Sequence, residues 1–158
     1  MVLGLPPNHD AMKMEKLAAD YLKRARSRLV DAEAALARGD YPEVVRYCQE
    51  LVELSLKACL RLVGIEYPKT HHVGDVLKLH GERFPEWFQP LVAEFDRISA
   101  ELVIKRAPSM YGIEAAGKSP SELFDEAEAS ESLRKAKHVF DNVDKLFREK
   151  TGQASGPT

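Results

Sequence analysis

Two consecutive cations followed by a proline, a tyrosine and a glycine set the stretch VIKRAPSMYGIE, residues 103–114, apart from the rest of the chain. A guanidinium can hold a phosphate through two parallel hydrogen bonds, and a phenol ring offers a face on which a nucleobase can stack. A glycine lets the backbone approach a ligand, because it carries no Cβ. We therefore assign a candidate nucleotide- or anion-binding site to Lys105, Arg106, Tyr111 and Gly112.

A structural interpretation of the same cations stays open. The sequence predicts that Pro108 ends a helix, because the residue before a proline avoids the helical region. Lys105 and Arg106 then lie at a helix C-terminus, where positive charge interacts favourably with the helix dipole. On that interpretation Tyr111 only packs against its neighbours, and no nucleotide binds.

The sequence gives little support for other kinds of active site. The segment THHVGDVLKLH, residues 70–80, is rich in histidine, but a metal site in a helical bundle takes Glu-x-x-His from facing helices, and no histidine here has a glutamate three residues before it. Arg134 and His138 are one helical turn apart and could act on a phosphate, although such surface pairs are usually solvated. Glycine-rich phosphate loops and a serine-nucleophile elbow are absent from the sequence. We expect no metal, no cofactor and no catalytic residue.

The two cysteines indicate a reducing compartment. Cys48 and Cys59 fall on one predicted helix, too far apart for a disulfide, and are expected to be buried apolar thiols. No basic leader precedes a long apolar run, and no apolar window is long enough to span a membrane. We expect a cytoplasmic protein.

The helices that position these residues can be predicted from the periodicity of the apolar side chains. It predicts long amphipathic helices at 11–37, 41–63, from 85 to Pro108, and from 121 or 130 to 150, with a short helix at 73–80. Between the first two, Gly39 suits a left-handed cap, and Asp40 with Glu43 suits a capping box. The prediction is an all-α, antiparallel up-down four-helix bundle with one additional short helix, covering residues 11–150 between a flexible N-terminus (1–10) and a disordered tail (151–158).

The second helix should be the most buried. Its core face is formed by Val45, Cys48, Val52, Ser55, Cys59 and Leu62, with Leu56 widening it, whereas Glu53 lies on the opposite face. The net charge of −2 gives no general affinity for nucleic acid. The charge is uneven, since residues 12–30 are basic and residues 113–131 acidic. Either a partner surface or two helices facing each other would explain this.

Four stretches, in this order, resemble the HEPN family: ALARGDYPEVVRYCQELVELSLKACLRLVG, THHVGDVLKL, KRAPSMYGIE and SPSELFDEAEASESLRKAKHVFDNV. Together they lie within about residues 12–147. The resemblance implies a homodimer of helical bundles, and we add His72 of the second stretch to the nucleotide-binding candidates. Apolar side chains such as Trp87, Phe88 and Met110 are expected to be only partly covered in one bundle, which also favours an isologous dimer.

The HEPN resemblance also bears on catalysis. Nuclease members of that family carry Arg-x(4–6)-His at the dimer interface, whereas the next histidine after Arg106 here is His138. The resemblance therefore implies a non-catalytic module that binds a nucleotide or a partner, such as a small nucleotidyltransferase in a toxin–antitoxin-like system. One alternative is a metal-independent ribonuclease in which a displaced histidine (His71, His72 or His138) folds toward Arg106. The other is a purely structural interaction protein.

Overall fold

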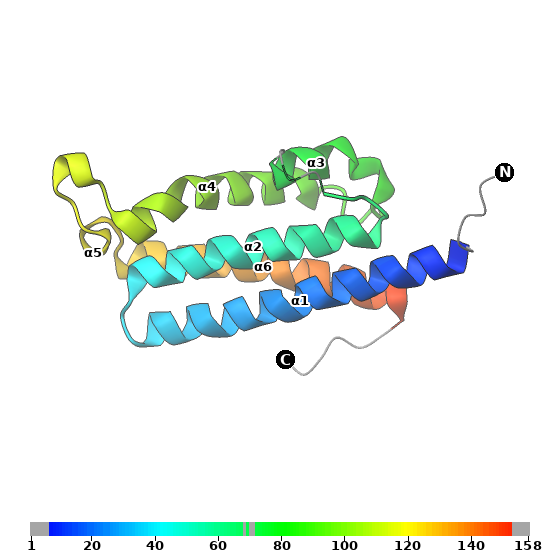
Figure 1. Ribbon diagram of the computed structural model, residues 1–158, viewed down its shortest axis with the longest axis horizontal. Coiled ribbons are helices and arrows are strands. Elements are labelled where there is room, and N and C mark those ends of the chain that lie inside the picture. The colour runs from blue at the N-terminus through cyan, green and yellow to red at the C-terminus, as the bar shows by residue number, and fades with distance from the viewer. Residues whose placement is uncertain (1–6, 68, 70–71, 153–158) are drawn as a thin grey trace.

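Four long helices pack side by side in the computed structural model, which describes residues 7–67, 69 and 72–152 (Figure 1). These helices are α1 (Pro7–Ala37), α2 (Tyr41–Leu62), α4 (Leu91–Tyr111) and α6 (Glu126–Thr151), and they alternate in direction along the chain. Two short helices, α3 (Val73–Leu79) and α5 (Pro120–Leu123), and two 3₁₀ turns, η1 (Gly81–Arg83) and η2 (Glu114–Ala116), complete the described part. The all-α antiparallel bundle is confirmed, but a second short helix, α5, joins the one that was expected.

The core is organised around α2, which packs against α1, α4 and α6. Its predicted core face is buried, and Leu56 in particular is fully buried. Both cysteines are buried there too, and burial raises the pKa of the Cys48 thiol to about 12 and raises that of Cys59. A thiol with such a pKa stays protonated near neutral pH. The expectation that both cysteines are buried thiols is confirmed.

The turn between α1 and α2 is only partly as predicted. Gly39 adopts the left-handed conformation, with φ of +77°. Asp40 precedes α2, but its side chain accepts no capping hydrogen bond, because its ψ of 75° takes the backbone away from the extended conformation of an ordinary N-cap. A capping box forms instead at α5, where the Ser119 N–H donates to Glu122 Oε2 over 2.8 Å.

Both ends of α4 differ from the prediction: the helix begins later than expected and continues past Pro108. The helix begins at Leu91 and not at Pro85, since residues 85–90 form successive turns ahead of it. It also continues through Pro108 to Tyr111. A proline near a helix C-terminus removes only one backbone hydrogen bond, and a single helical turn follows it here. The expectation that Pro108 stops the helix is therefore wrong, which changes the position of Lys105 and Arg106.

The ends of the bundle lie slightly outside the predicted limits. α1 begins at Pro7, inside the stretch expected to be flexible, and α6 includes Thr151. Residues 1–6 and 153–158 lie outside the described residues. Within the described part, no helix has both the length and the apolar character needed to cross a membrane.

The two oppositely charged segments form their ion pairs separately. Arg26 in the basic segment pairs with Asp144, and Arg28 pairs with Asp31. In the acidic segment, Glu128 pairs with a cation of α4 and Glu131 with Arg134 of α6. These pairs give no support to the interpretation that the two segments face each other.

The expected partial exposure is confirmed for Trp87 and Met110 and is wrong for Phe88. Phe88 is fully buried and makes an edge-on contact with the ring of Phe95. Trp87 is half-buried, and its Nε1–H donates to Glu149 Oε2 over 2.8 Å. The large exposed apolar side chains include three on α4, namely Val103, Ile104 and Tyr111.

Candidate anion-binding site

Lys105 and Arg106 lie along the side of α4, and their side chains leave the helix in different directions. Lys105 Nζ is 2.9 Å from Glu128 Oε1 on α6. Arg106 Nη1 instead donates hydrogen bonds of 2.8 Å to Gln49 Oε1 and to Glu50 Oε2 on α2. Consecutive residues of a helix point about 100° apart, which accounts for the divergence. The two cations therefore do not converge on one ligand.

Tyr111 is the last residue of α4, and Gly112 follows it as the C-cap. The Tyr111 side chain is 64% exposed. Gly112 has a φ of +68°, and a Cβ at this position would collide with the carbonyl oxygen of Lys118. Reciprocal hydrogen bonds of 2.9 and 3.0 Å between Ile113 and Lys118 close the turn. Gly112 is therefore needed for the approach of the chain to itself, and the expected open backbone for a ligand is wrong.

Arg106 and His72 come together at a cavity between α2, α4 and the segment that leads into α3. We call this the α2–α4 cavity. Its volume is about 460 Å³, within the range of small-molecule sites. It is lined by Gln49, Glu50, Glu53, Tyr67, Lys69, His72, Val73, Val103 and Arg106. Two of the five residues assigned from the sequence thus share a site, whereas Lys105, Tyr111 and Gly112 are not among its lining residues.

The Glu50 carboxylate organises the charges beside this cavity. Arg106 approaches it from α4 at 2.8 Å, Arg28 from α1 at 3.5 Å, and Arg46 from within α2 at 3.5 Å. Burial by itself lowers the pKa of Arg46, but the charges of Glu43 and Glu50 outweigh burial and raise it. One carboxylate therefore holds guanidinium groups from three helices in place, and of these three Arg106 is the one that lines the α2–α4 cavity.

The aromatic residue of the cavity is Tyr67, which the sequence analysis did not select. Burial, and secondarily the charge of Glu53, raises the pKa of the Tyr67 phenol. Lys57 Nζ lies 5.0 Å from the centre of the same ring. Lys69 was also missed, although both residues belong to the segment IEYPKTHH that precedes α3. An aromatic and a cation in the loop before His72 were the available signal.

A second, smaller cavity adjoins the first across α2. Its volume is about 300 Å³, and it lies between α1 and α2. It is lined by Arg24, Ser27, Arg28, Glu50, Glu53, Leu54 and Lys57. Glu50 and Glu53 line both cavities, so these two carboxylates separate a group of cations on α1 and α2 from the group around Arg106.

The other histidine considered from the sequence is held by its neighbours. His138 Nε2 lies 2.8 Å from Glu94 Oε1, and its Nδ1 lies 3.3 Å from the side-chain nitrogen of Asn142. Arg134 is paired with Glu131. Arg134 and His138 do line one cavity, of about 230 Å³, on the α4–α6 side. Both side chains have protein partners, as Arg106 does, but their cavity has half the volume of the α2–α4 cavity and no tyrosine lines it, so this pair is the weaker candidate.

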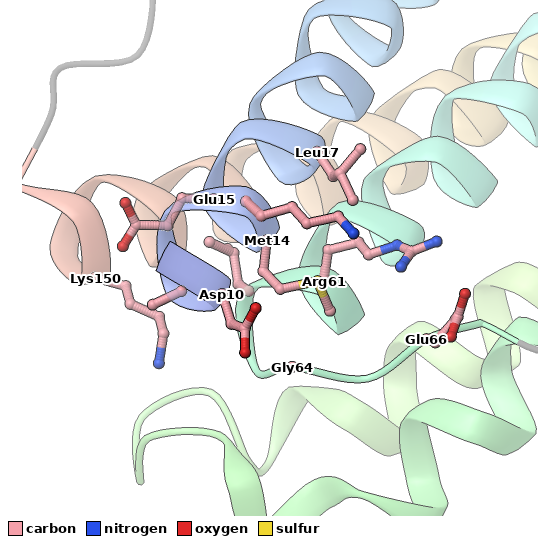
Figure 2. Close-up of a pocket in the computed structure, with 11 residues that line it drawn as sticks. Asp10, Met14, Glu15, Leu17, Arg61, Gly64, Glu66 and Lys150 are labelled. Carbon is pink, nitrogen blue, oxygen red and sulfur yellow. The ribbon is translucent and has the colours of Figure 1, made fainter. Parts of the chain in front are cut away.

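Another cavity lies at the end of the bundle where α1 begins. Its volume is about 650 Å³, and Figure 2 shows it with Met14 and Arg61 near its middle and Lys150 and Glu66 on opposite sides. Three acidic and three basic side chains line it, so it lacks the excess of one charge that would select an ionic ligand.

Among the described residues no group of three or more His, Cys, Asp or Glu side chains could hold a metal ion. His71 lies outside the described residues.

Comparisons with known proteins agree with this architecture. A family model described as the HEPN domain matches residues 18–146. A protein of Methanocaldococcus jannaschii named "Putative toxin MJ1304" is 28% identical over 144 residues, which are 87% of this chain and 92% of that protein.

Among solved structures, the crystal structure of TT1696 from Thermus thermophilus superimposes with a TM-score of 0.59 at 24% sequence identity. The match covers 82% of this chain and 97% of that one. At this level of identity the similarity concerns the fold alone.

Proposed function

This chain belongs to the HEPN domain family, and we propose that it is a non-catalytic member of that family whose α2–α4 cavity binds a nucleotide or another phosphate-bearing ligand. The observation that carries the proposal is the joint lining of one cavity by Lys69, His72, Arg106 and Tyr67. Two cations and an imidazole can hold a phosphate, and the tyrosine supplies a ring for a base. A cavity of about 460 Å³ is of the right size for a mononucleotide.

The residue spacing after Arg106 supports a non-catalytic role. Four residues separate Arg106 from Tyr111, so a tyrosine stands at a spacing where nuclease members of the family carry histidine. A phenol is a poor general base at neutral pH, because its oxygen keeps its proton there. The loss of the histidine leaves binding as the simpler role for Arg106.

A homodimer is part of the proposal. One side of α4 is exposed along its length and carries Ala93, Arg97, Ala100, Ile104, Ala107 and Tyr111. These residues follow one another at steps of four and three, the spacing of a seam between two packed helices. Ile104 is 75% exposed, which is unusual for a large apolar side chain in a monomer. An isologous contact between two copies of α4 would cover this side.

The name of the archaeal relative supports a role in a toxin–antitoxin-like pair. We infer that this chain is the toxin-type component and that its partner is a small nucleotidyltransferase. Expressing the chain alone in a bacterial host should arrest growth, and co-expressing a small nucleotidyltransferase that acts as its partner should restore growth. Unimpaired growth with abundant soluble chain would contradict the toxin role.

Nucleotide titration tests the central proposal. We expect GMP, AMP or inorganic phosphate to release heat in calorimetry with the wild type, and Arg106→Ala together with Lys69→Ala to remove that signal. Lys16→Ala is the matched control, since Lys16 is an exposed cation on α1 that lines none of the cavities described above. The absence of binding by every nucleotide at millimolar concentration would overturn the proposal and favour a purely structural interaction protein.

A metal-independent ribonuclease is the second candidate, because His72 and Arg106 line the same cavity although they are far apart in sequence. His72 could take the proton from a ribose hydroxyl, while Arg106 stabilises the charge that develops on the phosphate. RNA cleavage in the presence of EDTA, lost in His72→Ala and in Arg106→Ala but kept in His80→Ala, would establish this activity. An intact RNA substrate after incubation with the wild type would exclude it.

A further inference from the structure

Glu53 is the carboxylate of the α2–α4 cavity whose charge is least engaged by cations. Its side chain is 39% exposed, and the Lys57 ammonium lies 3.8 Å away. Glu50, one turn earlier, is 21% exposed and has the Arg106 guanidinium at 2.8 Å. Since both carboxylates line the cavity, Glu53 is the one available to accept hydrogen bonds from a ligand.

Glu53 also lies close to the aromatic ring of the site. Glu53 and Tyr67 line the same cavity, and the charge of Glu53, after burial, contributes to raising the pKa of the Tyr67 phenol. Lys57, the cation paired with Glu53, lies over the Tyr67 ring. Because Glu53 and Tyr67 line the same cavity and share Lys57 as a contact, a planar group stacked on Tyr67 inside this cavity would have its edge beside the Glu53 carboxylate.

We propose that Glu53 makes the cavity selective for guanine nucleotides, an inference that rests on the proposed nucleotide-binding function. A carboxylate has only acceptors, and guanine presents two adjacent donors, N1–H and the N2 amino group, which match its two oxygens. Adenine presents a donor beside an acceptor, N1, and that acceptor would face a carboxylate oxygen. Uracil and cytosine each present a single donor group on the corresponding edge. Guanine is therefore the base that this carboxylate accepts best.

The remaining residues of the cavity complete the recognition. Lys69, His72 and Arg106 take the phosphate, Tyr67 takes the face of the base, and Glu53 takes its edge. The Glu53 carboxylate would repel a free anion, but in this arrangement it contributes to binding by accepting hydrogen bonds from the base. Phosphate contacts supply affinity for every nucleotide, and Glu53 supplies the difference between them.

Calorimetric titration of GMP, AMP, CMP and UMP tests the inference. We expect the wild type to bind GMP about tenfold or more tightly than AMP, the discrimination typical of one two-point hydrogen-bonding pair. Glu53→Gln should lose this preference and turn it toward AMP, because a glutamine amide offers one donor and one acceptor, as adenine requires. Glu82→Gln, at an exposed glutamate on η1, is the matched control and should keep the preference for GMP.

The outcomes separate the two proposals. Equal binding of GMP and AMP by the wild type, or an unchanged GMP preference in Glu53→Gln, would overturn the selectivity of Glu53 and leave nucleotide binding intact. A failure of all four nucleotides to bind would overturn the nucleotide-binding function and the selectivity together. Because Glu53 is half-exposed and glutamine has the same shape, the variant should keep the fold, which a melting curve checks.

Discussion

The guanidinium of Arg106 lies 2.8 Å from the carboxylate of Glu50 and joins α4 to α2 across 56 residues of sequence. The same nitrogen donates to Gln49 Oε1, also over 2.8 Å. Gln49 is almost fully buried, so its amide oxygen relies on this hydrogen bond. The contact therefore has a structural role beside its place in the candidate site.

Arg106→Ala should lower the free energy of unfolding by about 1–3 kcal/mol, because a buried amide oxygen and a carboxylate lose their donor. Urea unfolding followed by circular dichroism measures this. Lys16→Ala, at an exposed position of α1, should cost less than about 0.5 kcal/mol. Equal losses in the two variants would mean that the Arg106 contact contributes nothing specific.

Glu50→Gln should change stability and phosphate affinity in opposite directions. The free energy of unfolding should fall, because three guanidinium groups lose their shared counter-charge. The dissociation constant for inorganic phosphate should fall too, meaning tighter binding, because Arg106 no longer has to exchange a carboxylate for the ligand. Calorimetry on the folded variant measures the second effect, and weaker phosphate binding would show that Glu50 is not a competitor.

Leu56→Ala should destabilise the protein by about 2–5 kcal/mol, because Leu56 is fully buried in the core of the bundle. Glu53→Ala, on the outer side of the same helix, should cost well under about 1 kcal/mol. Thermal unfolding of both variants distinguishes the two faces of α2. Similar shifts in melting temperature would contradict the orientation of this helix.

Gly112→Ala should cost more than Gly64→Ala, although both glycines are left-handed, with φ of +68° and +79°. A Cβ at Gly64 meets open space, whereas one at Gly112 collides with the Lys118 carbonyl. The strained backbone alone costs about 1–2 kcal/mol, and the collision adds to it at Gly112. Comparable unfolding free energies for the two variants would show that the turn at Gly112 relaxes freely.

Ile104→Glu should convert the proposed dimer into a monomer, because it places a charge in the middle of the exposed side of α4. Leu79→Glu is the control, since Leu79 is similarly exposed but lies on α3. Sedimentation velocity at micromolar concentration measures both variants and the wild type. A monomeric wild type would rule out the dimer, and a dimeric Ile104→Glu variant would place the interface elsewhere.

The candidate site was only partly predictable. Arg106 and His72 were selected from sequence and do share a cavity, whereas Lys105 turns toward α6. The prediction for Lys105 failed because α4 continues past Pro108. Inside a helix, the direction of a side chain is set by how the helix is rotated about its axis, so Lys105 does not project from a helix end. Tyr67 was overlooked because a single aromatic in a loop carries no periodic signal.

By itself, the sequence determined the all-α class, the four long helices and the buried face of α2, because hydrophobic periodicity is a local property that each helix carries in its own residues. Only the tertiary structure decided which polar groups meet. The pairing of Arg106 with Glu50 depends on how α4 is rotated against α2, and the approach of His72 depends on the path of the segment into α3. Such juxtapositions arise from the packing of distant elements, and no spacing within one helix encodes them.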